Sequence, residues 1–197
     1  LKFEVELLSW AEKPKERWEL SAKEKIEKAA EYKSEATTLF KAGNWSDAQN
    51  SYTSAIDWVS HSYDFSDEDD KTAARELHAA CLLNAAQCSL KLADWPAAAS
   101  SCTTALGLSD LPTASKVKAL FRRGSAHIKM ASFSDARADL LAACKLDPKS
   151  KEIRDAYASI KAAEAAANEA DKGLFARMVK GAGGVKRKPP EGVPADA

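Results

Sequence analysis

Two cationic side chains, Lys118 and Arg122, are the residues of this chain best suited to binding chemistry. They stand four residues apart in the segment VKALFRR, residues 117–123. On a helix, this spacing places both side chains on one face, one turn apart. Arg can hold a carboxylate with two hydrogen bonds, and Lys adds a point charge. The pair predicts a carboxylate site; the alternative is a solvated basic face. The neighbouring Arg123 points off this face, and we expect it to be solvated.

Composition restricts the classes of function. Among 197 residues, Lys and Arg total 29 and Asp and Glu total 29, so the net charge is zero. No general attraction to nucleic acid or to an anionic membrane is indicated, and electrostatic recognition must be local. No apolar run reaches the roughly 20 residues of a membrane helix. The chain starts at Leu1 without a visible signal peptide, so we expect a piece of a longer protein.

The four cysteines lie inside helical patterns and show no metal-ligand spacing. We expect reduced, buried thiols, which are typical of the cytoplasm. They are Cys81, Cys88, Cys102 and Cys144.

One pattern occurs three times, at residues 40–48, 90–98 and 128–136, so that the copies start 50 and 38 residues apart. Each copy has an apolar residue, Lys, a short break, an aromatic residue and, three positions later, Ala. Paired helices that repeat with a period of about 34 residues are the signature of the tetratricopeptide repeat, or TPR. The longer offsets predict insertions, the larger at residues 60–71, which either loop out or lengthen the flanking helices.

The sequence therefore predicts an all-α TPR superhelix of three helix pairs over residues 22–148. The expected pairs are 22–42 with 45–61, 71–92 with 95–107, and 114–131 with 134–145, in repeats at about 29–62, 79–112 and 117–150. A C-terminal helix at 149–180 would cap the open end. Residues 181–197 are predicted to be disordered. Residues 1–10 alternate like the last strand of a missing domain, and residues 11–21 form a linker with Trp18 as a docking anchor.

Stacked helix pairs present their first helices on a concave groove. Alignment of the repeats through their shared Lys places five polar residues there. Asn84 lies in an apolar run, and a buried amide needs a partner; the alternative is a satisfied structural Asn. The predicted groove residues are Lys33, Thr37, Asn84, Lys118 and Arg122.

These positions resemble the dicarboxylate clamp of TPR co-chaperones. In that family, Lys and Asn of repeat one, Asn of repeat two, and Lys and Arg of repeat three hold the last Asp of a Glu-Glu-Val-Asp tail. Heat-shock proteins 90 and 70 carry such tails. Four positions match, and Thr37 replaces the first Asn. Phe40, one turn further, matches an aromatic residue that often packs under the peptide, although a core role is equally compatible.

A narrower resemblance is to the large FK506-binding-protein immunophilins. It rests on FEVELLSW, on ERWELSAKEKIEKA, on Thr37 itself, on IDW at 56–58, on ALGL at 105–108 and on LFARM at 174–178. It implies a peptidyl-prolyl isomerase domain upstream of Leu1, and hence a fragment that binds chaperones without being an enzyme.

Other chemistry is not indicated. His61, His78 and His127 are scattered, and no nucleophile triad, cofactor motif or metal cluster is visible. Residues 64–70 lack EF-hand spacing and are expected to be a solvated acidic loop. Residues 172–188 loosely resemble a calmodulin target; the alternative is a capping helix with a basic end. For the whole chain, the alternative function is a general TPR scaffold that binds another peptide or dimerises.

Overall fold

A computed structural model describes residues 2–4, 6, 15–61 and 65–182. Within these residues the chain is all-helical and has no strand. A short 3-10 helix η1 (Arg17–Glu19) precedes seven α-helices: α1 (Ala22–Lys41), α2 (Trp45–Val59), α3 (Glu68–Lys91), α4 (Trp95–Leu106), α5 (Thr113–Lys129), α6 (Phe133–Leu146) and α7 (Lys151–Ala182). The expected three helix pairs and C-terminal helix are confirmed. Of the strand predicted at 1–10, residues 2–4 and 6 are described and form no strand, and the rest lies outside the described residues. The disorder predicted at 181–197 also lies outside them, except for residues 181 and 182, which end α7.

Helix α1 starts where the sequence provides a capping box. The hydroxyl of Ser21 accepts a hydrogen bond from the backbone N–H of Glu24, and the Glu24 carboxylate accepts one from the N–H of Ser21 at 2.8 Å. Hydrogen bonds from Lys15 and Ser21 lower the pKa of Glu24 to about 2. The anionic cap satisfies backbone donors that the first turn leaves unpaired.

The three helix pairs turn at equivalent residues. Gly43, Ala93 and Ala131 have φ angles of 84°, 60° and 58°, in the left-handed region. Each lies in the short break between the repeated Lys and the repeated aromatic residue. Two copies hold this conformation with Ala, whose Cβ makes it less favourable than for Gly.

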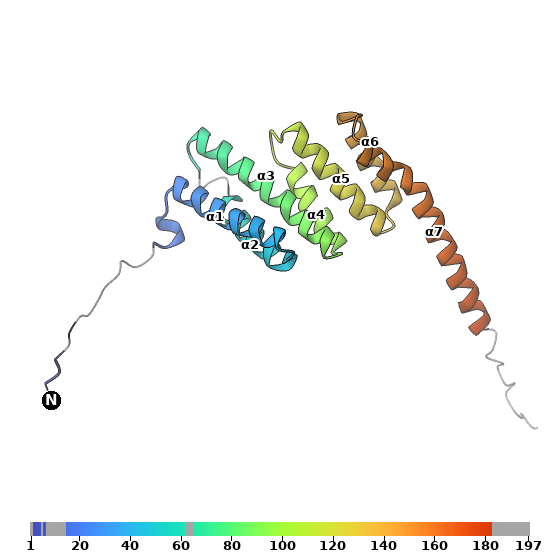
Figure 1. Cartoon of the computed structure of the whole chain (residues 1–197), viewed down its shortest axis with the longest axis horizontal. Helices are drawn as coiled ribbons and strands as arrows, with labels where there is room; N and C mark the ends of the chain where they lie inside the picture. The colour runs from blue at the N-terminus through green and yellow to red at the C-terminus, as the bar shows by residue number, and fades with distance from the viewer. Residues whose placement is uncertain (1, 5, 7–14, 62–64, 183–197) are drawn as a thin grey trace, which may run out of the picture.

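The helices form two layers (Figure 1). Each helix packs on the next one along the chain, and α1 also packs on α3, α3 on α5, and α5 on α7. The odd-numbered helices therefore line up side by side, as the first helices of stacked TPR pairs do.

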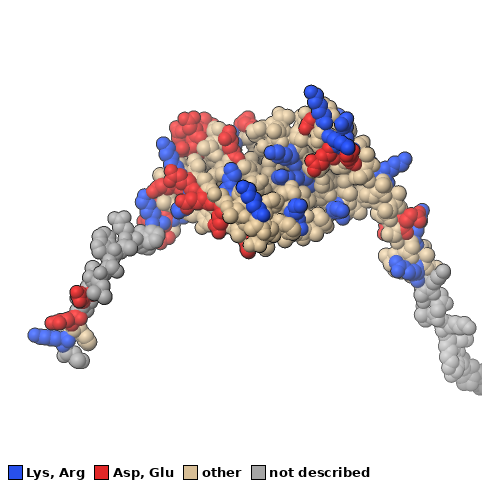
Figure 2. All heavy atoms as spheres, in the orientation of Figure 1, with Lys and Arg blue, Asp and Glu red and all other residues tan. Residues whose placement is uncertain are grey.

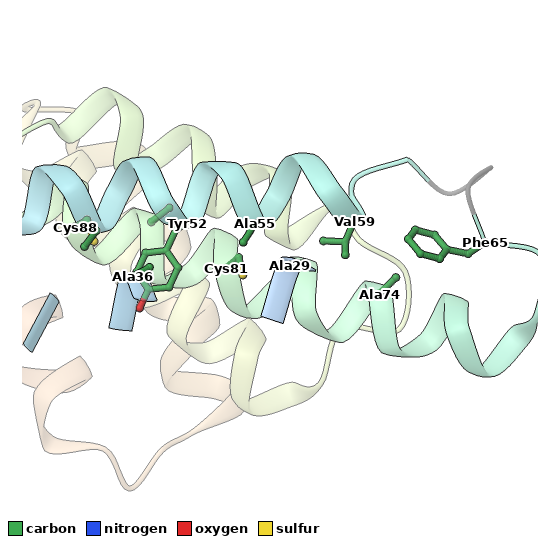
Figure 3. Packing of buried hydrophobic residues seen from close by; sticks show 11 residues of the cluster. Ala29, Ala36, Tyr52, Ala55, Val59, Phe65, Ala74, Cys81 and Cys88 are labelled. Carbon is green, nitrogen blue, oxygen red and sulfur yellow. The ribbon is translucent and has the colours of Figure 1, made fainter. Parts of the chain in front are cut away.

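The repeated Ala marks the core between the layers. Ala48, Ala98 and Ala136 are each fully buried. In the first pair, Tyr52 and Ala55 of α2 point toward Ala36 of α1 and Cys81 of α3 (Figure 3). Small residues at these positions allow the helices to approach closely.

Residues 60–71 divide between a connection and a helix extension. Helix α2 ends at Val59, and α3 begins at Glu68. Asp67 caps α3, since its carboxylate accepts hydrogen bonds from the N–H groups of Asp69 and Asp70. The acidic residues favour this helix start because they complement its dipole. Phe65 is 3% exposed and fixes the connection to the core.

Two expectations about single residues were wrong. Arg123 is not solvated: its Nε and Nη2 donate to the two carboxylate oxygens of Asp139 at 2.8 and 2.6 Å, and Asp139 is buried. A carboxylate in the core needs such a partner. Trp18 does not dock, because 77% of it is exposed. Instead Arg17 lies 4.8 Å from the centre of the Trp58 ring and donates to the Asp57 carbonyl.

Candidate functional site

All five predicted groove residues lie on the layer of odd-numbered helices. Lys33 and Thr37 are on α1, Asn84 is on α3, and Lys118 and Arg122 are on α5. Figure 2 shows cationic side chains over the middle of one face, with acidic side chains on both sides. A molecule without net charge thus has a locally basic region.

Arg122 is the most firmly placed of the cations. Its Nη1 donates to the carbonyl oxygen of Leu83, the residue before Asn84, at 2.6 Å. Burial lowers the pKa of its guanidinium. Among the described residues, no carboxylate lies within ion-pair distance of it. Because one carbonyl uses only part of its five-donor fork, the remaining donors can bind an anion.

The two lysines complete the group of cations. Lys118 is exposed and borders a cavity of about 450 Å³ together with Val117, Phe121 and Ile153. Lys33 is half-buried, and its charge acts on the buried thiol of Cys81 on α3. Neither lysine forms an ion pair within the described part of the chain. Their charges are therefore not neutralised by an ion pair.

The Thr37 hydroxyl is engaged within the protein. Thr37 Oγ1 donates to the Lys33 carbonyl at 2.8 Å and lies 3.0 Å from the hydroxyl of Tyr52. The Thr proton is used by Lys33, so Tyr52 donates to Thr37. Burial raises the pKa of Tyr52, while hydrogen bonding with Thr37 and Asn84 lowers it. Tyr52 thus joins α1, α2 and α3 below the groove.

Sequence reasoning missed Tyr52. Four residues beyond the repeated Ala, the other copies have Cys102 and Leu140, both fully buried. The repeat alignment predicts an apolar core residue at this position. The signal that could have revealed a polar role is the hydroxyl group, which Tyr52 adds in one copy only.

Glu152 was also missed. It lies in the first turn of α7, borders the same cavity as Lys118, and its negative charge acts on Arg122. A sequence reading had no reason to place α7 beside the groove.

Phe40 is half-buried and packs against the core cluster of the first helix pair. Its core role is therefore present in the structure. The three histidines do not come together: His78 is on α3, His127 on α5, and His61 follows α2. No three potential metal ligands cluster among the described residues. None of the described helices is both long and apolar enough to cross a membrane.

Comparisons with known proteins identify relatives of this chain. No family model matches the chain. The chain is 40% identical over 151 residues to peptidyl-prolyl cis-trans isomerase FKBP4 of Bos taurus and 38% identical to its Homo sapiens counterpart. Each match covers 77% of this chain and 32% of the relative. The chain thus spans about a third of the length of these curated relatives and is homologous to that part of them.

Solved structures agree with the fold. The C-terminal TPR-containing domain of a Plasmodium falciparum putative FK506-binding protein superposes with a TM-score of 0.68 and 25% identity, covering 80% of this chain and 99% of that one. The first TPR of Spaghetti (RPAP3), bound to the HSP90 peptide SRMEEVD, superposes with a TM-score of 0.56 and 24% identity. That match covers 71% of this chain and 95% of the other. The TPR fold and the resemblance to FK506-binding immunophilins are confirmed.

Proposed function

We propose that this chain is a peptide-binding co-chaperone module. Its groove captures the acidic C-terminal Glu-Glu-Val-Asp tail of heat-shock protein 90, with heat-shock protein 70 as a second ligand. In the cytoplasm it brings an attached peptidyl-prolyl isomerase to the chaperone. The observation that carries the proposal is Arg122, a half-buried cation tied to the Leu83 carbonyl and not paired with a carboxylate in the described structure.

The chemistry follows from the donors that remain available. A C-terminal Asp has two carboxylates close together, one on the main chain and one on the side chain. Lys33, Asn84, Lys118 and Arg122 can donate to them from three helices of one layer. Thr37 does not donate to the peptide, because its hydroxyl proton already goes to the Lys33 carbonyl. Its role is to hold the neighbouring groove side chains in place. Charge-assisted hydrogen bonds in a partly buried site are stronger than exposed ion pairs.

Known neighbours support the choice of ligand. The first TPR of Spaghetti (RPAP3) was solved with the HSP90 peptide SRMEEVD, and the second TPR of human RPAP3 with the HSP70 peptide SGPTIEEVD. Both peptides end in Glu-Val-Asp preceded by Glu, so both present the same pair of carboxylates.

The test is a calorimetric titration with Met-Glu-Glu-Val-Asp and with its C-terminally amidated form. We expect the amide to bind at least tenfold more weakly, because it lacks one carboxylate. Arg122→Ala should weaken binding of the acid by about 10- to 100-fold, as one charge-assisted hydrogen bond is worth about 1.5–3 kcal/mol. The matched control is Arg137→Ala, which removes an Arg of α6 that pairs with Glu164 of α7. Equal affinity for acid and amide would rule out the clamp.

A second candidate function is a TPR scaffold that dimerises or binds a partner through α7. Leu174, Phe175, Met178 and Val179 on this helix are between 52% and 69% exposed. Calmodulin is one partner that an apolar helix with basic neighbours would fit. Sedimentation of the chain alone and with calmodulin tests this candidate, and a monomer unaffected by calmodulin contradicts both forms of it.

A further inference from the structure

A second cavity, of about 400 Å³, lies between the first and second helix pairs. Its apolar wall consists of Val59 at the end of α2, Phe65, Ala74 on α3 and Leu108 after α4. Figure 3 shows the Phe65 ring pointing toward Val59. A volume of this size is within the range of about 300–1,000 Å³ that small-molecule sites occupy.

His78 provides a polar group in this cavity that the protein itself does not use. The residue lines the cavity and is only 8% exposed, yet no hydrogen bond of its imidazole occurs in the described structure. Burial lowers the pKa of this imidazole, which favours its neutral form. A neutral imidazole donates one hydrogen bond and accepts another. An imidazole that lines a cavity without a partner in the described structure can bind a polar group of a ligand.

Two cations on the same helix border the cavity. Lys71 and Arg75 are one turn apart on α3 and line it with His78. Lys71 pairs with Glu68 at 3.2 Å, and Arg75 pairs with Asp110 at 2.9 Å and with Glu68 at 3.4 Å. The carboxylate side chains of these pairs are 75% and 84% exposed. Because both carboxylates are exposed to solvent, an incoming anion can take their place at Lys71 and Arg75.

We propose that this cavity is a binding site for a small aromatic carboxylic acid. The ring lies against Phe65, Val59 and Leu108, and the carboxylate binds at Lys71 and Arg75 with His78 donating a hydrogen bond. The site is independent of the proposed clamp. His78 and Asn84 are six residues apart on α3, which separates them by about 9 Å along the axis and about 120° around it.

Nuclear magnetic resonance of the histidine rings in the full chain tests this proposal, with 3-phenylpropionate as the probe and 3-phenylpropanol as its uncharged analogue. His127 on α5 provides an internal control, because it does not line the cavity, whereas His78 does. We expect the His78 ring signals to shift saturably with phenylpropionate and the His127 signals to stay in place. Phenylpropanol should bind at least threefold more weakly.

Two variants locate the ligand. Ala74→Leu extends a side chain into the cavity and should abolish the saturable shift; a thermal melt verifies its fold. Arg75→Gln removes the positive charge of Arg75, whose side chain is 28% exposed. We expect this variant to bind phenylpropionate only as tightly as the unmodified chain binds phenylpropanol. Arg122→Ala should bind phenylpropionate like the unmodified chain.

Absence of a saturable His78 shift would overturn the proposal, as would unchanged binding by Arg75→Gln. Loss of binding in Arg122→Ala would place the acid in the groove and also overturn it. None of these results affects the peptide titration, so failure here and failure of the clamp are distinguishable.

Discussion

The single proton of the Thr37 hydroxyl goes to the Lys33 carbonyl oxygen of its own helix. A Thr in a clamp position therefore has no donor left for a peptide carboxylate. Its lone pair instead receives the Tyr52 proton from α2. The buried Tyr52 of α2 is thus hydrogen-bonded to Thr37 of α1 and to Asn84 of α3.

Tyr52→Phe tests this positioning role. We expect the affinity for Met-Glu-Glu-Val-Asp to fall about fivefold, because a typical hydrogen bond contributes on the order of 1 kcal/mol. Adding Thr37→Asn should restore affinity, since an amide donates directly to the carboxylate. A purely structural loss would not be rescued in this way. Tyr157→Phe on α7, where Tyr157 is 38% exposed, is the control. Unchanged affinity in Tyr52→Phe would contradict the role.

Sequence reasoning succeeded at the residue scale where the repeat determined the position. Aligning the shared Lys placed Lys33, Asn84 and Lys118 on one layer of helices. It failed for Arg123, because the partner, Asp139, is 16 residues away on the next helix. The periodicity identifies the face of a helix that a side chain occupies, but an ion pair depends on the neighbour that packs there.

At the scale of the elements, Gly124 determines how closely α5 approaches α6. A Cβ at this position would lie 2.8 Å from Cγ of Leu140, which is fully buried. Cβ atoms in proteins essentially never come that close to another heavy atom, so the Leu140 side chain or one of the two helices must shift. Close packing of this pair matters for the proposed site, because α5 carries Lys118 and Arg122.

Gly124→Ala should therefore destabilise the fold. Overpacking costs up to about 3 kcal/mol, which exceeds the helix-propensity gain of about 1 kcal/mol from Gly to Ala. Gly173→Ala on α7 is the matched control, since a Cβ added there would have no atom within 4 Å. Urea unfolding of both variants measures the difference. A Gly124→Ala chain as stable as the control would show that α5 and α6 can separate without cost.

The order of the helices was predictable, but the connections between them were predicted less well. Capping signals such as Ser21 with Glu24, and the three repeated breaks, mark the ends of helices directly. The acidic residues after position 65 favour a loop in the sequence, whereas α3 begins at Glu68. The local composition is compatible with a loop and with the first turn of a helix. The burial of Phe65, three residues before Glu68, favours a helix that begins at Glu68.

At the scale of the whole molecule, zero net charge means that long-range attraction to an acidic peptide must come from the basic region of one face. Helix α7 adds a negative charge there, because it packs on both α6 and α5. Its first turn brings Glu152 close to Lys118 and Arg122. This contact depends on the path of the chain after α6, which no repeat pattern encodes.

Glu152→Gln should therefore tighten binding of Met-Glu-Glu-Val-Asp. Charges separated by 4 Å in water interact by about 1 kcal/mol, so an exposed Glu at a longer distance should change the affinity by about two- to threefold. Glu169→Gln, on the same helix but paired with Lys172 and exposed, removes the same charge and should leave affinity unchanged. The gain from Glu152→Gln should shrink as salt rises above about 0.1 M, where the screening length is about 10 Å. If the two variants bound the peptide with equal affinity, the charge of Glu152 on α7 would have no effect on peptide binding in the groove.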